Sequence, residues 1–168
     1  MIALRRATPD DVDFLVGLFN DEEVEPFLGG RHPRDAASVR DEVERSQREP
    51  QKIGRMIIEI DGERAGTVGF DELSEANRIA HLGGLAVHPD FRGRRVPDEA
   101  ARLFQRYLIF ELGFHRLELE VYAFNERALA HNDRVGFVRE GVKRRAYLRD
   151  GEWVDAVMYA LLREDLEP

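Results

Sequence analysis

The residues of this sequence that are best suited to bind an anion lie in one short stretch. Residues 92–98 read RGRRVPD, and they stand between an apolar run and a helical pattern. A helix that begins here presents unpaired main-chain N–H groups and the positive end of its dipole, and both attract anions. Guanidinium groups also suit phosphate oxygens. The stretch therefore predicts a phosphate-binding turn, although an ordinary solvated turn before a helix is the alternative.

A second group of side chains could accept a proton near the ends of the expected central strands. These candidates are His81, Asp71, Glu72 and Glu75. Strand alternation would place His81 on one face with Gly83, Leu85 and Val87, where it could look into a cleft. The alternatives are that His81 is a hydrogen-bonded residue at a strand end and that the acids are solvated residues of a hairpin. The Gly83-Gly84 pair indicates a bulge or a close backbone approach.

Composition removes several kinds of chemistry and of partner. The chain has 168 residues and no cysteine, so a disulfide framework, a thiolate nucleophile and a cysteine zinc site are excluded. No other metal-binding constellation stands out, and we expect none. A formal charge of −8 argues against nucleic-acid binding. No window approaches the roughly 18 apolar residues of a membrane span, so we expect a cytoplasmic protein that binds no membrane.

The elements that must position these residues follow from hydrophobic periodicity. A first helix begins at the cap Thr8 and carries the stripe Phe14, Leu15, Leu18 and Phe19. After breaks at Gly29-Gly30 and His32-Pro33, a polar helix is expected over 34–49, with Ala36, Val39 and Val43 on its buried side. Further helices are expected over 97–112 and 125–136. Strands are expected over 53–60, 64–70, 79–87, 115–122, 137–148 and 153–162.

The order of these elements indicates a mixed α/β fold. A strand, a helix and a strand over 79–122 form a crossover, which makes the two strands parallel. The hairpin at Asp61-Gly62 makes the earlier strands antiparallel. We therefore expect one domain over residues 1–168, with an antiparallel start to the sheet and a parallel central pair.

Three segments of the second half resemble the GCN5-related N-acetyltransferases (GNAT). They are residues 85–94 (LAVHPDFRGR), 125–128 (NERA) and 135–141 (VGFVREG). The last, with 150–155 (DGEWVD), is similar to the branch that acetylates the amino termini of ribosomal proteins. The family's loop reads Arg or Gln, two residues, Gly, one residue, then Gly or Ala. Arg92 matches its first position, whereas Arg95 and Pro97 replace the two small residues.

The resemblance implies acetyl-CoA, or another acyl-CoA, as co-substrate. It implies that the pantetheine arm follows the strand at Leu85, Ala86 and Val87, and that Asn125 meets the arm as well as capping a helix. Asn132 stands where many relatives carry a tyrosine that acts as general acid toward the departing thiolate. His131, beside it in the helix, is expected to point elsewhere. The residues implied to bind the cofactor are Leu85, Ala86, Val87, Arg92, Gly93, Arg94, Arg95, Val96, Pro97, Asp98, Asn125 and Asn132.

The expected activity is transfer of an acyl group to a primary amine by direct attack, with Asn132, His81 and Glu72 as candidate catalytic residues. The acceptor is a small molecule or a peptide amino terminus, and a homodimer is left open. A site without a strong general base favours an α-amine, with a pKa of about 7.7 to 8.0, over a lysine amine, with a pKa of about 10.4, because more of the α-amine is neutral at pH 7. The cations Arg139, Lys143, Arg144 and Arg145 could attract an acidic acceptor or form a solvated face. A non-catalytic binding module with a degenerate CoA loop is the alternative function.

Overall fold

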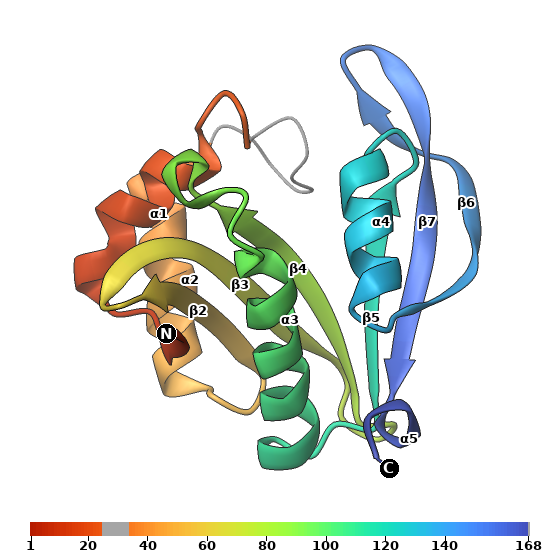
Figure 1. The fold of residues 1–168 in the computed structure, drawn as a ribbon, viewed down its shortest axis with the longest axis horizontal. Helices are drawn as coiled ribbons and strands as arrows, with labels where there is room; N and C mark the ends of the chain where they lie inside the picture. Colours follow the sequence, from red (N-terminus) through yellow and green to blue (C-terminus); the bar gives the residue numbers. More distant parts are fainter. Residues whose placement is uncertain (25–33, 168) are drawn as a thin grey trace.

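The computed structural model describes residues 1–24 and 34–167, which form a mixed seven-stranded sheet with helices on both faces (Figure 1). The strand order is β1-β2-β3-β4-β5-β7-β6. The strands are β1 (Ile2–Arg6), β2 (Ile53–Ile60), β3 (Glu63–Ser74), β4 (Ile79–Val87), β5 (Arg116–Tyr122), β6 (Val138–Arg149) and β7 (Glu152–Leu162). The helices are α1 (Val12–Phe19), α2 (Ala36–Arg48), α3 (Val96–Arg106), α4 (Glu126–Arg134) and α5 (Arg163–Leu166). The expected breaks at 29–30 and 32–33 lie outside the described residues.

The pairing of the strands confirms the predicted fold class. β4 and β5 are parallel and are joined through α3, whereas the other neighbouring strands are antiparallel. The last hairpin joins the sheet through β7, which lies between β5 and β6. β3 runs on to Ser74, so Asp71 and Glu72 lie within a strand and not in a hairpin turn.

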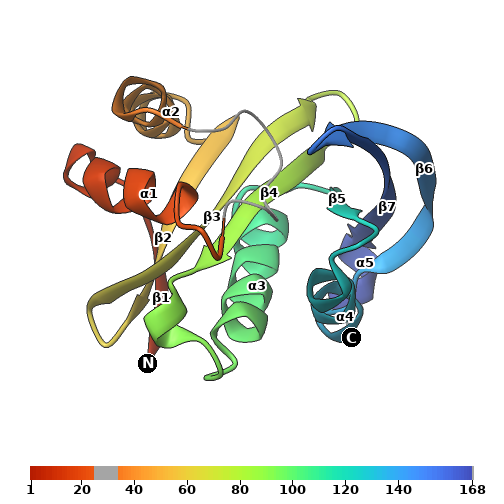
Figure 2. The same ribbon diagram turned by 90° about the horizontal axis from the view of Figure 1, so that it is seen from above.

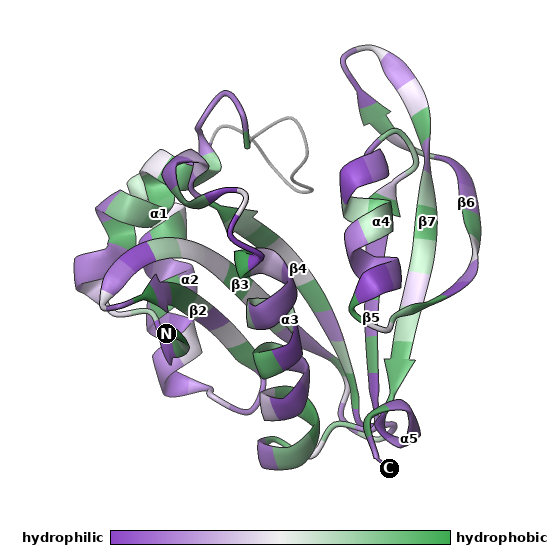
Figure 3. Ribbon diagram, viewed as in Figure 1, coloured by the Kyte–Doolittle hydropathy of each residue, from purple (hydrophilic) through white to green (hydrophobic). Residues whose placement is uncertain are grey.

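The two faces of the sheet carry separate cores. α1 and α2 cover one face, where Leu15, Val39, Val43 and Ile57 are buried together (Figure 2). Ala36 was expected on this buried side but is exposed, because α2 begins at Ala36 and its buried stripe starts one turn later at Val39. α3 covers the other face and shows hydrophilic and hydrophobic bands, as a helix with one buried side does (Figure 3).

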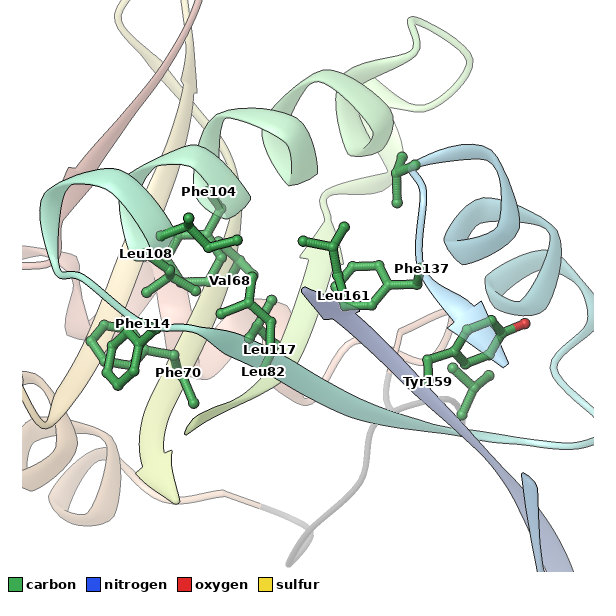
Figure 4. Close-up of a cluster of buried hydrophobic side chains, with 14 of the residues drawn as sticks. Val68, Phe70, Leu82, Phe104, Leu108, Phe114, Leu117, Phe137, Tyr159 and Leu161 are labelled. Carbon is green, nitrogen blue, oxygen red and sulfur yellow. The ribbon is translucent and has the colours of Figure 1, made fainter. Parts of the chain in front are cut away.

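The core beneath α3 is aromatic and extends to the carboxyl-terminal strands. Phe104 of α3 and Leu108 of the π-helical turn that continues it (Tyr107–Glu111) pack against Phe70 and Leu82, and Phe114 closes this end (Figure 4). Phe137, Tyr159 and Leu161 belong to the same cluster and attach the β6–β7 hairpin to it. This continuous packing fixes β5 and β7 relative to β4, and so fixes the space between them.

β4 has a bulge that decides where its side chains point. Gly69 pairs with Gly83, but Thr67 pairs with Ala86, so β4 carries one extra residue there. Gly84 has a φ of 65°, which few residues other than glycine adopt. The bulge reverses the alternation: Leu82 and Val87 both face α3, while His81 points to the opposite face. The predicted shared face of His81 with Leu85 and Val87 is therefore wrong, although the predicted bulge is confirmed.

Candidate functional site

A large cleft lies where β4 and β5 separate. The two strands pair only from Ile79 to His81, and beyond that point they diverge (Figure 1). The cleft has a volume of about 1560 Å³ and reaches both faces of the sheet. Its "α3–α4 end" is lined by Arg92, Gly93, Arg95, Pro97, Asp98, Asn125, Arg127, His131, Asn132 and Arg134. Its "α1–α2 end" is lined by Phe19, Arg34, Glu42, Arg55, Asp71 and His81.

The 92–98 stretch forms the turn into α3, as its sequence predicts. Within the described residues, the main-chain N–H groups of 93–96 and of Asp98 have no hydrogen-bond acceptor. Arg95 has φ 56° and ψ 18°, a left-handed conformation that costs a non-glycine residue about 1 to 2 kcal/mol. This open set of donors at a helix amino terminus can hold an anion.

Not every residue of this turn reaches the cleft. Arg92 is at its rim, 3.3 Å from a carboxylate oxygen of Glu23. The guanidinium of Arg94 lies over the ring of Phe91, 5.7 Å from its centre, and does not line the cleft. Val96, the first residue of α3, has a fully buried side chain. The side chains of Arg94 and Val96 therefore do not contribute to the cleft.

Asp98 is held by α4 and does not face the open end of the turn. Its Oδ1 lies 2.8 Å from Nδ1 of His131, and its Oδ2 lies 3.0 Å from Nε of Arg134. The hydrogen bond from Arg134 is the largest cause that lowers the pKa of Asp98, to about 2. His131, which was expected to point away from the position of Asn132, is buried with its Nδ1 on Asp98, and it lines the cleft. Burial lowers the pKa of His131, and Asp98 offsets this only in part.

The two asparagines behave differently. The side chain of Asn125 accepts a hydrogen bond from the N–H of Ala128 at 3.2 Å, which confirms the predicted helix cap. Asn132 is nearly buried and donates through Nδ2 to the carbonyl oxygen of Ala128 at 2.9 Å. Both line the cleft together with Leu85, Ala86 and Val87 of β4. The structure thus brings these expected residues to one place.

His81 and Asp71 form a pair at the α1–α2 end. They are direct partners across β3 and β4, with 3.3 Å between Nδ1 of His81 and Oδ1 of Asp71. This hydrogen bond raises the pKa of His81, against an opposing effect of burial. Because an ionised carboxylate only accepts, Nδ1 carries the hydrogen, and Nε2 of the neutral ring is left as a proton acceptor.

Glu72 does not join this pair. It follows Asp71 in β3, so its side chain lies on the α3 face, where a carboxylate oxygen is 3.7 Å from Nη1 of Arg78. It does not line the cleft, and neither does Glu75. The strand alternation that separates Asp71 from Glu72 is the physical reason.

A buried arginine at the α1–α2 end was not expected from the sequence. Arg55 of β2 contacts Glu42 of α2, with 2.6 Å between Nε and Oε1, and Arg34 contacts the other oxygen at 3.4 Å. Both guanidinium groups lie over the ring of Phe19. Burial opposes ionisation of Glu42, but Arg55 and Arg34 outweigh it and lower the pKa of Glu42. The signal was available, because Arg55 is a charged residue within an apolar strand.

Two cations of β6 are paired with acids. Arg139 binds Asp133, and Lys143 contacts Glu120, which also accepts from the hydroxyl of Tyr147. Across residues 1–24 and 34–167, no cluster of three or more His, Asp or Glu is arranged to hold a metal ion. No helix in these same ranges is long and apolar enough to cross a membrane.

The amino-acid sequence matches a known family profile over most of its length. The profile described as "Acetyltransferase (GNAT) domain" matches residues 2–138. The SPbeta prophage-derived N-acetyltransferase YokL of Bacillus subtilis is 27% identical, over 99% of this chain and 92% of the relative. YdaF of the same organism, provisionally named a ribosomal N-acetyltransferase, is 30% identical over 64% of this chain and 58% of its own.

Solved structures have the same fold. A crystal structure of a probable acetyltransferase has a TM-score of 0.83 and 26% identity, and covers 97% of this chain and 93% of the other. Spermidine N-acetyltransferase from Vibrio cholerae, in complex with CoA and spermine, has a TM-score of 0.88 and 19% identity. That comparison covers 98% of this chain and 96% of the other, and at this identity it shows only that the fold is shared.

Proposed function

Since the chain belongs to the GNAT acetyltransferase family, we propose that it transfers an acetyl group from acetyl-CoA to a primary amine in the cleft between β4 and β5. The acceptor is a small molecule or a peptide amino terminus, and residues 1–168 act as one domain. The observation that carries this proposal is the cleft itself. It reaches both faces of the sheet, with open helix-terminus donors at one end and the His81–Asp71 pair at the other.

The α3–α4 end fits the phosphates of acetyl-CoA, whose thioester supplies the acetyl group. The free N–H groups between Gly93 and Asp98 are donors for phosphate oxygens, and Arg95 and Arg127 add positive charge around them. Pro97 removes one donor from this set. The carboxylate of Asp98 is offset by Arg134, so it does not oppose an anion as a free acid would. The fold also supports the proposal, because a structure of the same fold was solved with CoA.

The main chain of β4 supplies a donor for the acyl oxygen. Beyond His81, the β4 groups that face β5 have no strand partner among the described residues, because the two strands have separated. We assign the N–H of Leu85, next to the bulge, as the donor that stabilises negative charge on this oxygen. The N–H of Ala86 faces β3, because Ala86 and Thr67 follow His88 and Ala65 as a hydrogen-bonded pair of the ladder. The donor is a main-chain group fixed by the bulge, so no side chain is needed for this role.

His81 is proposed to take the proton from the acceptor amine. Asp71 orients the ring and leaves Nε2 free to accept. An amine attacks only in its neutral form, so an acceptor with an α-amine needs less help than one with a lysine-type amine. Asn132 can donate a hydrogen bond but not a proton. We expect this to cost little, because a thiol with a pKa near 8.5 leaves readily at neutral pH.

The alternative is a binding module that keeps the fold without turnover, and two measurements separate it from an enzyme. Calorimetric titration with acetyl-CoA tests binding, and thiol release with a panel of primary amines tests transfer. For an enzyme we expect both, with His81→Gln lowering kcat/KM about 10²-fold or more. His88→Gln is the matched control, because His88 pairs with Asp90 outside the cleft. Binding without thiol release for any amine would favour the binding module.

A further inference from the structure

We propose that Arg55 binds a carboxylate group of the acceptor, so that the acceptor is a free amino acid or a similar small amine with a carboxylate close to its amino group. This inference rests on the proposed function and narrows its substrate class.

Arg55 lies flat across a row of glycines toward the β4 bulge. Arg55, Gly69 and Gly83 are successive partners on β2, β3 and β4. A Cβ atom added at Gly69 would lie 2.6 Å from Cζ of Arg55, and one added at Gly84 would lie 3.0 Å from its Nη1. The glycines therefore leave the space that the guanidinium occupies. Its end rests against the bulge where we expect the acyl group.

The hydrogen-bonding groups of Arg55 are not all used. A guanidinium has five N–H donors. The N–H groups of Arg55 donate to Oε1 of Glu42 at 2.6 Å and, weakly, to Oγ1 of Thr67 at 3.4 Å. Within residues 1–24 and 34–167 they have no other acceptor. Its side chain is only 9% exposed, yet Arg55 lines the cleft. Buried donors without acceptors are costly, so this arrangement indicates a ligand that supplies them.

The charges of Arg55 and its immediate partners, Glu42 and Arg34, favour an anion over a cation. Arg34 and Arg55 share the single carboxylate of Glu42, so these three side chains together carry a net charge of +1. Of two nearby acids in the lining of the cleft, Glu120 is paired with Lys143, whereas Asp71 hydrogen-bonds the neutral ring of His81 and keeps its negative charge. A planar carboxylate matches the fork of a guanidinium, whereas a second ammonium group of a polyamine would be repelled.

His81 and Arg55 approach neighbouring residues of the β4 bulge. Cε1 of His81 lies 3.7 Å from the position of a Cβ on Gly83, so the ring leans over the residue next to the bulge. Arg55 reaches Gly84 from the β2 side. His81 and Arg55 therefore both reach the bulge, at neighbouring glycines, and an α-amino acid could place its amine beside His81 and its carboxylate on Arg55. A peptide amino terminus has an amide in place of that carboxylate.

The test compares acceptors that differ only at the carboxylate. Amino acids, their amides and the corresponding decarboxylated amines are assayed by thiol release, each at the pH where its amine is mostly neutral. We expect kcat/KM to be about tenfold to a hundredfold higher for the acid than for the amide. Equal or better use of the amide or the decarboxylated amine would overturn the inference while leaving the acetyltransferase activity intact.

A binding experiment without turnover separates this inference from the proposed function. The probe is an N-acetyl amino acid and its amide, titrated calorimetrically into the protein saturated with CoA. We expect the acid to bind more tightly, and Arg55→Lys, which keeps the charge but loses the fork, to reduce this preference about tenfold. Arg45→Lys is the control, since Arg45 pairs with Glu49 on the surface of α2. Acid-selective binding without thiol release from any amine would leave the carboxylate site standing and overturn the proposed activity.

Discussion

The carboxylate of Asp98, in the first turn of α3, lies 2.8 Å from Nδ1 of His131 on α4. This contact joins the two helices that border one end of the cleft. Gln105 reinforces it by donating to the carbonyl oxygen of Val135 at 3.0 Å, farther along α3. The acid that would otherwise weaken an anion site at the start of α3 therefore connects the two sides of that site.

Asp98→Asn should lower the free energy of unfolding at pH 7 by about 1.5 to 3 kcal/mol, the usual range for a hydrogen bond to a charged group. The pKa of Asp98 is about 2 in the folded protein and near 3.9 when unfolded. Its stabilisation is therefore complete above pH 4 and is lost as the pH falls through 2. Denaturant unfolding between pH 2 and 7 measures this. Glu49→Gln, at an exposed pair, should change stability by under about 0.5 kcal/mol at any pH.

Asp71→Asn should move the acidic limb of the pH–rate profile to lower pH. Asp71 raises the pKa of His81, and a base works only when it is unprotonated, so activity rises with pH through that pKa. Loss of Asp71 lowers this pKa toward its ordinary value. Measurement of kcat/KM against pH for one acceptor in both proteins checks this, with Asp90→Asn beside His88 as the control. An unmoved limb would remove His81 from its proposed role.

Arg95→Gly should stabilise the protein by up to about 1 kcal/mol, because glycine adopts the left-handed conformation of residue 95 without steric cost. The same change removes a cation from the α3–α4 end, so the affinity for acetyl-CoA should fall. Thermal unfolding and calorimetry report the two effects separately. Tighter binding of acetyl-CoA by Arg95→Gly would show that the side chain obstructs the site.

Gly84→Ala should cost about 1 to 2 kcal/mol of stability or more, because its φ is 65° and the new Cβ would lie 3.0 Å from Nη1 of Arg55. The displaced guanidinium should also reduce activity toward acids. Gly141→Ala is a matched control on β6, since a Cβ there has no neighbour within 4 Å. Chemical denaturation compares the two, and equal stability would contradict the strain assigned to the bulge.

Several features of this protein were determined by local sequence. The cap at Asn125, the turn into α3 and the crossover of β4, α3 and β5 each follow from residue types within one element or its flanks. Gly83-Gly84 likewise predicted the bulge. The family resemblance, confirmed by the profile match, came from the same short segments.

Other features depended on the tertiary structure. The face of His81 depended on a single extra residue in the β3–β4 register, which reverses every side chain beyond it. The separation of Asp71 from Glu72 required β3 to continue to Ser74. The contact of Asp98 with His131, and that of Arg55 with Glu42, join residues far apart in the chain. Periodicity reports which residues are buried within one element, but only packing decides which elements meet and therefore which charges share a site.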